Sequence, residues 1–153
     1  MIHRYRYEAE YYSTLDRLPL DLRRKLDVTG VKLSLKDWLA FSFEERTVLC
    51  HLPCDADEEA MVLVNYLAFL MRKYLGKPLE KISALDPALW HADALPEAVR
   101  EKSAALSSAV TIEQWSRWPS HHRYALYKTA LSTSQPEAFE QVLKQLRESS
   151  SAK

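Results

Sequence analysis

One segment of this chain occurs twice, and the repeat constrains the fold more than any other feature of the sequence. Residues 18–49 align with residues 95–126 at a constant offset of 77 (95 − 18) and without a gap. The identical pairs are Leu18/Leu95, Pro19/Pro96, Arg23/Arg100, Lys25/Lys102, Trp38/Trp115, Arg46/Arg123 and Leu49/Leu126. Because a gapless repeat keeps apolar and capping positions in register, we expect segments 18–52 and 95–131 to form two copies of one three-helix unit.

Helix start and stop signals divide each copy into its helices. Pro19 suits the first turn of a helix, and Gly30 suits the left-handed position that ends one. Ser34 and Thr111 stand at equivalent places, and each is followed three residues later by an acid or an amide. This spacing satisfies the free amides at a helix start, so both residues predict a short second helix. Ser42 repeats the signal and predicts a third helix.

A strongly apolar segment separates the two copies. Asp55 and Glu58 provide capping groups for a helix over residues 55–75, and Gly76 provides its stop. Apolar side chains fill most positions of this helix and leave almost no polar face. We therefore expect it to be surrounded on most sides, as the central helix between the copies.

The remaining segments predict little regular structure. Residues 3–17 alternate tyrosine or alanine with charged residues, a period of two that suits a short strand or an extended arm. The short segments 31–33 and 108–110 occupy equivalent places and are expected to pair as a minimal two-stranded ladder. Residues 77–93 predict a long connection with one turn at 87–90.

These elements together predict an all-α fold. We expect a single helical domain over residues 1–148 and a disordered tail over residues 149–153. The parts of the domain are repeat one (18–52), the central helix (55–75), repeat two (95–131) and a C-terminal helix (134–148).

The charge balance disfavours two classes of partner. Apolar residues make up 47% of the 153 residues and charged residues 27%, which is ordinary for a globular protein. The 21 basic residues are matched by 21 acidic residues, so the chain has no net charge. Without a basic excess there is no long-range attraction to nucleic acid or to an anionic membrane, and we expect neither as a partner.

The sequence also disfavours export and membrane insertion. The first residues, MIHRYRYEAEYY, are charged and aromatic, unlike the apolar core of a secretory signal. The longest apolar run, from Met61 to Met71, is about 11 residues, whereas a membrane-spanning helix needs about 20. We therefore expect a cytoplasmic protein whose two cysteines are free thiols.

The cysteines lie close together, in the sequence Cys50-His51-Leu52-Pro53-Cys54. This group supplies at most three soft ligands, and no second pair of Cys or His residues completes a tetrahedral metal site. The spacing also differs from the CxxC of thiol redox enzymes. We expect no bound metal and no cofactor, with Cys50 as a buried structural thiol.

The repeated arginines are the candidate binding residues. Arg23 with Arg100 and Arg46 with Arg123 recur at the repeat offset. A guanidinium group offers a rigid fork of donors, which can brace carbonyl groups between helices or hold a phosphate or carboxylate. The sequence alone leaves both roles open.

Candidates for other sites are few. Trp90 and His91 stand in the irregular connection, and aromatic residues in such places are typical of protein interfaces. The chain contains no glycine-rich phosphate loop, no GxSxG and no HExxH sequence. The commonest enzyme classes are therefore disfavoured.

The most specific pattern in the chain runs from Leu18 to Trp38 and reads LPxxLRxKLDxxGVKLxLxxW. A tyrosine-rich segment precedes it, and Glu45-Arg46 and Pro53-Cys54 follow it. Further matching positions are Trp90, Leu95, Pro96, Trp115, Arg123 and Leu126. Over most of residues 5–131 this pattern resembles the nitrate reductase-associated protein family, a small bacterial family often encoded near nitrate reductase and molybdopterin-biosynthesis genes.

The resemblance implies a cellular context without a catalytic residue, because the family carries no established molecular activity. We expect a non-enzymatic accessory protein of nitrate assimilation that binds nitrate reductase or a molybdenum-cofactor delivery factor. The alternative is an enzyme or carrier that acts on a phosphorylated pterin cofactor precursor. In that case Arg23, Arg46, Arg100 or Arg123 would hold the phosphate group.

Overall fold

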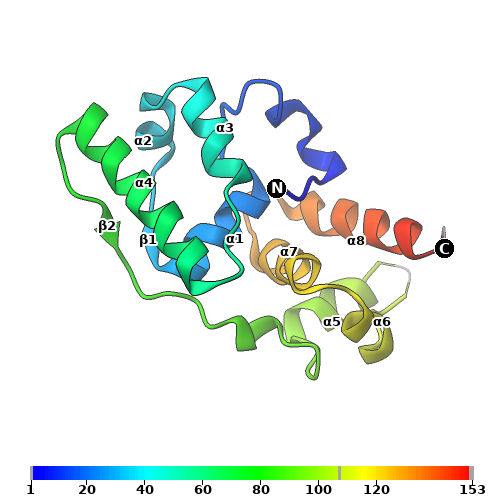
Figure 1. Cartoon of the computed structure of the whole chain (residues 1–153). Helices are drawn as coiled ribbons and strands as arrows, with labels where there is room; N and C mark the ends of the chain where they lie inside the picture. The colour runs from blue at the N-terminus through cyan, green and yellow to red at the C-terminus, as the bar shows by residue number, and fades with distance from the viewer. Residues whose placement is uncertain (1, 107, 152–153) are drawn as a thin grey trace. The chain divides into compact units, whose positions relative to one another are not determined.

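The computed structural model describes residues 2–106 and 108–151 and confirms a mostly α-helical chain (Figure 1). Within the described residues the only β structure is one antiparallel ladder of two short strands. The described chain divides into two compact units, each with its own buried apolar side chains. Residues 2–4 and 8–86 form the first unit, and residues 5–7 and 87–151 form the second.

The first unit is built around α1. Its elements are α1 (Leu20–Thr29), β1 (Val31–Lys32), α2 (Leu35–Ala40), α3 (Phe43–His51), α4 (Asp57–Leu75) and β2 (Glu80–Lys81), preceded by the 3-10 helix η1 (Arg6–Tyr11), which belongs to this unit from Glu8 onward. Helix α1 packs against α3 and α4, and α2 packs against α4. Their shared core includes Leu22, Trp38, Leu49, Leu63 and Leu67, all nearly inaccessible to solvent.

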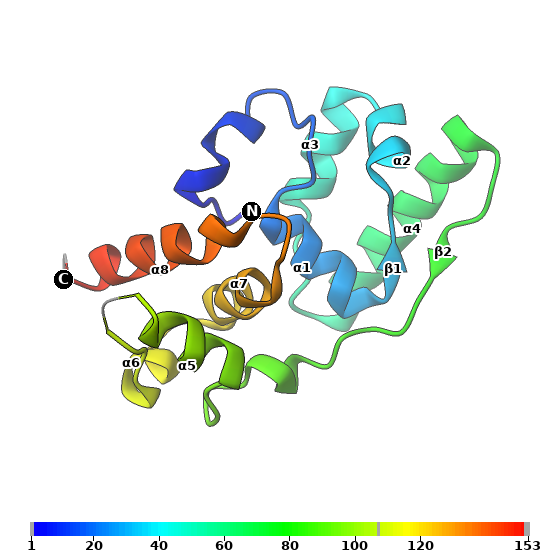
Figure 2. The ribbon, with the colours of Figure 1, turned by 180° about the vertical axis from the view of Figure 1, so that it is seen from behind.

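The second unit is built around α7. Its elements are the 3-10 helix η2 (Pro87–Trp90), α5 (Glu97–Ala104), α6 (Ile112–Arg117), α7 (Ser120–Leu131) and α8 (Pro136–Ser151). Helix α7 packs against α5, α8 and η2 (Figure 2). Its buried apolar side chains include Trp90, Trp115, Tyr124, Leu126, Phe139 and Val142. The turn expected at residues 87–90 is confirmed by η2.

The helices of the two repeated segments follow the same order. Helices α1, α2 and α3 begin at residues 20, 35 and 43, and α5, α6 and α7 begin at residues 97, 112 and 120. Each helix of the second segment therefore starts 77 residues after its counterpart. That the two segments superpose and arose by duplication stays a prediction.

The expected helix ends follow from local hydrogen bonding. The Ser34 hydroxyl accepts a hydrogen bond from the backbone N–H of Asp37, and Thr111 does the same for Gln114. Ser42 and Glu45 form a reciprocal capping box at the start of α3. These capping signals are confirmed.

Two predictions for the first unit's irregular segments are wrong. β1 pairs with β2, with Val31 opposite Lys81, and not with residues 108–110. The chain that follows α4 runs back past the end of α1, where the Ile82 N–H donates to the Gly30 carbonyl. The arm contains the 3-10 helix η1 in place of a strand, because this turn brings the Glu8 carboxylate to donors that an extended arm would leave out of reach.

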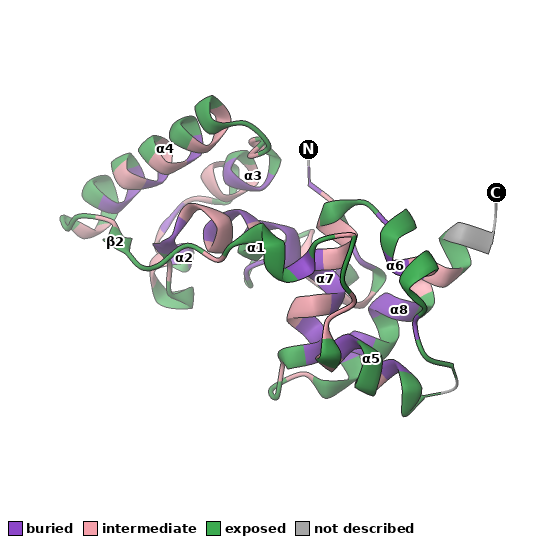
Figure 3. Cartoon of the chain, turned by 90° about the horizontal axis from the view of Figure 1, so that it is seen from below, coloured by how far each residue is buried: buried purple, intermediate pink, exposed green. Residues whose placement is uncertain are grey.

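Helix α4 also differs from expectation. It begins at Asp57, and Glu59 caps it by accepting from the backbone N–H groups of Asp55 and Ala56. The expected burial on most sides is wrong, because only one side of the helix faces the unit's core and the opposite side is exposed (Figure 3). Helices α1 and α2 pack on α4, and its buried residues, Leu63, Leu67, Leu70 and Met71, all lie on one side of the helix.

The C-terminal helix is displaced from its predicted bounds. Helix α8 starts at Pro136, where the Ser132 hydroxyl accepts from the Gln135 N–H, and it runs to Ser151. The predicted tail is thus wrong for residues 149–151, since no glycine or proline ends the helix there; residues 152–153 lie outside the described chain. None of the described helices combines the length and apolar character needed to span a membrane.

Candidate functional site

In the first unit, the repeated tryptophan and arginine hold the segment that precedes α1. The Trp38 indole N–H donates to the Leu15 carbonyl at 2.7 Å. The Arg46 guanidinium donates to the carbonyls of Phe41 and Thr14, both at 3.3 Å, and lies over the Trp38 ring. Leu15 itself has a φ of 50°, a left-handed conformation that these contacts help to hold. Arg46 therefore braces backbone carbonyls.

The second unit repeats this arrangement with α6 and α7. The Trp115 indole N–H donates to the His91 carbonyl at 2.8 Å. The Arg123 guanidinium donates to the Trp90 carbonyl at 2.8 Å and also to the Trp118 carbonyl. Burial lowers the pKa of Arg123 from its ordinary value. Arg123 and Arg46 hold equivalent positions and perform the same bracing role.

The other repeated pair has separate environments. Arg23 donates from Nε to the Leu18 carbonyl at 3.2 Å, at the start of α1. Arg100 pairs with the Glu97 carboxylate on the exposed side of α5. Within each unit the two arginines thus contact different groups, and their guanidinium groups share no partner among the described contacts.

Trp90 and His91 separate in the structure. The Trp90 ring is 1% exposed and packs edge-on against Tyr124, with 5.0 Å between the ring centroids. His91 lies at the surface, where its Nδ1 accepts from the Asp93 N–H. Of the two partner-binding candidates, only His91 presents its side chain outside the core.

The two cysteines are free thiols of low expected reactivity. Cys50 is buried in α3, and Cys54 is half-buried beyond its end. Burial raises the pKa of the Cys50 thiol to about 12 and also raises that of Cys54, which disfavours the reactive thiolate. Across residues 2–106 and 108–151, no three His, Cys, Asp or Glu side chains form a set that could hold a metal ion.

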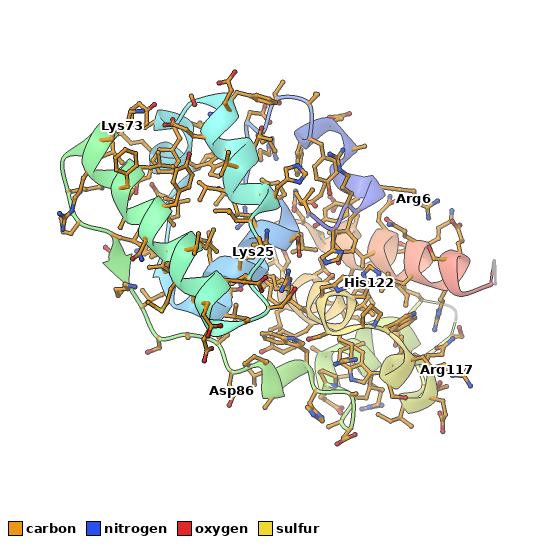
Figure 4. All side chains as sticks on the ribbon, viewed as in Figure 1. Arg6, Lys25, Lys73, Asp86, Arg117 and His122 are labelled. Carbon is orange, nitrogen blue, oxygen red and sulfur yellow. The ribbon has the colours of Figure 1, made fainter. Side chains whose placement is uncertain are left out.

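A group of buried charges beside these cysteines was not predicted from the sequence. Lys25 on α1 is fully buried, and its ammonium group donates to the carbonyls of Cys50 and Leu52, both at 2.6 Å (Figure 4). The Asp21 carboxylate, one turn earlier, accepts from the His3 N–H and from Arg24. The feature of the sequence that could have indicated this burial is the position of Lys25 on the apolar face of α1.

Glu8 is, after Asp21, the second buried acid that was not predicted from the sequence. Its carboxylate accepts from the Tyr12 hydroxyl at 2.9 Å and from the Leu20 N–H at 2.8 Å. Burial raises the pKa of Glu8 to about 7, and these two hydrogen bonds oppose the rise only in part. No periodicity in the sequence marks this residue, because its burial depends on the 3-10 turn.

Comparison with known proteins identifies a family. A family model described as conserved nitrate reductase-associated protein matches residues 4–146 and so covers nearly the whole chain. No match was found among curated proteins or among solved structures.

Proposed function

Because the chain belongs to the conserved nitrate reductase-associated protein family, we propose that it is a cytoplasmic, non-enzymatic accessory protein of nitrate assimilation. Its partner in this proposal is nitrate reductase or a factor that delivers the reductase's molybdenum cofactor. The family match is the single observation that carries the proposal.

The surroundings of the arginines favour a binding protein over the alternative, an enzyme or carrier for a phosphorylated pterin. A phosphate site needs guanidinium groups whose donors are free to converge on one anion. Arg46 and Arg123 each donate to two backbone carbonyls, and Arg100 is paired with Glu97. Binding a phosphate at Arg46 or Arg123 would require breaking their contacts with backbone carbonyls, and at Arg100 the phosphate would compete with Glu97.

The proposal is tested with the tagged full-length protein in nitrate-grown cells. Two results together support the accessory role. Nitrate reductase copurifies with the protein, and a deletion strain has a lower reductase activity, which added cofactor restores. His91→Ala should weaken the copurification because His91 is the candidate partner-binding residue whose side chain lies at the surface. The exposed histidine of the first unit serves as the matched control, and His51→Ala should leave copurification unchanged.

Two outcomes would count against the proposal. Unchanged reductase activity in the deletion strain, with no reductase or cofactor factor copurifying, would remove its basis. The pterin alternative is tested separately by thermal unfolding with a phosphorylated pterin, since a ligand at 100 times its Kd stabilises by about 2.7 kcal/mol. We expect no such stabilisation. If the pterin raises the unfolding temperature and Arg123→Lys abolishes this rise, the alternative is favoured.

A further inference from the structure

The exposed side of α4 carries three large apolar side chains. Met61 is 63% exposed, Val62 55% and Phe69 56%. With Glu58, Asn65 and Arg72, at intervals of three or four residues, they form one side of the helix, which we call the outer face of α4. Large apolar side chains grouped on an exposed helix face mark an interaction surface.

The core of the first unit does not require these residues. Leu63, Leu67, Leu70 and Met71 already provide a complete inward stripe on α4. On the outer face, the ring of Phe69 stacks on that of Tyr66, with 6.5 Å between centroids and 18° between planes. This contact restricts the Phe69 ring and presents a defined aromatic surface to a partner.

Charges at the two ends of α4 have opposite sign. The first turn carries Asp57, Glu58 and Glu59, and the last turn carries Arg72 and Lys73. Glu59 is committed to the helix cap, and Lys73 pairs with Glu45 at 3.0 Å. Glu58 and Arg72 form no ion pair with any other described residue.

The outer face is symmetric about Asn65. Glu58 and Arg72 lie seven residues before and after Asn65, and Met61 and Phe69 lie four residues before and after it. An identical helix running in the opposite direction would place opposite charges together at both ends and apolar side chains together between them. Such a self-complementary patch is what a two-fold symmetric dimer requires.

We propose that a second copy of this chain packs antiparallel on the outer face of α4. Glu58 then faces the partner's Arg72, Met61 lies beside the partner's Phe69, and the two Asn65 residues meet at the two-fold axis. The inference goes beyond the proposed accessory function and does not depend on it.

The expected dimer is weak. Helix α4 has 19 residues, so it is about 28 Å long. One helix pair of this length forms an interface at the small end of the known range. We therefore expect a dissociation constant in the micromolar range and a protein that is mainly monomeric when dilute.

Charge reversal tests both the surface and its occupant. Sedimentation of the full chain from about 1 µM to about 500 µM should give a monomer–dimer equilibrium. Glu58→Arg or Arg72→Glu alone replaces two attractive pairs by repulsive ones and should weaken the dimer roughly tenfold. The double variant restores opposite charges and should recover wild-type affinity, while Glu140→Arg, an exposed reversal on α8, should have no effect.

Two further variants examine the centre of the interface. Phe69→Ser removes the aromatic contact and should abolish dimerisation while the folded helix content, checked by circular dichroism, is unchanged. Asn65→Cys should form a disulfide across the two-fold axis under mild oxidation at protein concentrations that populate the dimer. Lys144→Cys, at an exposed position on α8, should not.

The proposal is overturned if the chain stays monomeric over the whole concentration range. It is equally overturned if a dimer forms that Phe69→Ser does not weaken, or if the double charge reversal fails to recover the affinity lost by the single variants. A monomer whose copurification with nitrate reductase is lost on Phe69→Ser would assign the outer face to that partner instead.

Discussion

Lys25 shows how one buried side chain can connect two helices. Its ammonium group donates to the carbonyls of Cys50 and Leu52, which lie at the C-terminal end of α3. A helix leaves its last carbonyls without intrahelical partners, and that end also carries partial negative charge. Lys25 therefore satisfies acceptors that would otherwise be buried unpaired, and it fixes α1 against the end of α3.

Replacing this lysine should strongly destabilise the protein. Lys25→Met keeps the length of the side chain and removes the donor, which leaves two carbonyls unsatisfied and should lower the free energy of unfolding by about 2–4 kcal/mol. The repeat supplies the control, because Lys102 is half-buried and its side chain forms no hydrogen bond with any other described residue. Lys102→Met should change the free energy by less than about 0.5 kcal/mol. If urea unfolding shows that Lys25→Met and Lys102→Met lower the free energy of unfolding equally, this role for Lys25 is contradicted.

Glu8 should make stability depend on pH. Burial raises its pKa to about 7 from an ordinary value of 4.5. An acid with a raised pKa in the folded state binds its proton more tightly when folded, so its contribution is complete below pH 4.5 and is lost as the pH rises through about 7. Glu8→Gln mimics the protonated acid and should be more stable than wild type at pH 8 by roughly 2–3 kcal/mol.

The control for this pH effect lies in the same 3-10 helix. Glu10 is exposed, and Glu10→Gln should leave the dependence of unfolding on pH unchanged. The charged groups that act on the pKa of Glu8 are Arg23 and Asp21, which both variants retain. If wild type and Glu8→Gln differ in stability equally at pH 4 and pH 8, Glu8 does not titrate in this range.

At the scale of the helix, Gly30 and Gly76 end α1 and α4 in the same left-handed conformation, with φ of 71° and 61°. A side chain in this conformation costs about 1–2 kcal/mol at either position. A Cβ at Gly30 would also lie 2.6 Å from the Ile82 carbonyl oxygen, whereas a Cβ at Gly76 would meet nothing within 4 Å. Gly30→Ala should therefore lower stability by at least about 1 kcal/mol more than Gly76→Ala; similar melting temperatures for the two variants would contradict this prediction.

Local signals predicted the helices well, because helix ends depend on neighbours in the sequence. Ser34, Ser42 and Thr111 cap the helices that they were expected to cap, and both glycines end theirs. The ladder partner of Val31 could not be found in this way, because pairing depends on the path of the chain after α4. The 3-10 helix η1 was missed for a similar reason, since its buried carboxylate contacts the distant Leu20 N–H.

The candidate residues were predictable in position but only partly in role. The repeat located Arg46 and Arg123, and their type allowed either a brace or an anion site. Only the carbonyls within reach of each guanidinium favour the brace. The exposure of the outer face of α4 could not be predicted from hydrophobicity. A helix with apolar residues on all sides has the same sequence pattern whether its own chain buries it or a partner covers it.

At the scale of the whole molecule, the total charge is balanced. The sequence holds 21 basic and 21 acidic residues. Helix α7 carries Arg123 and Lys128 and no acidic residue, so it is a local exception. The Arg123 guanidinium donates to the Trp90 and Trp118 carbonyls, however, so those donors are not available to a phosphate. The chain thus lacks the net positive charge that commonly accompanies binding to the phosphate backbone.

We therefore predict that the protein does not bind nucleic acid. Binding to duplex DNA depends on releasing counterions from several phosphates, and a chain without net charge gains little from that release. The anisotropy of a labelled duplex should stay constant up to about 10 µM protein at about 50 mM salt, conditions that detect even non-specific binding. Replacing the exposed Glu10, Glu113 and Glu140 by lysine raises the net charge by about six, and this variant should bind. Anisotropy that rises with the wild-type protein and falls steeply with added salt would show that α7 forms a basic surface strong enough to override the neutral total charge.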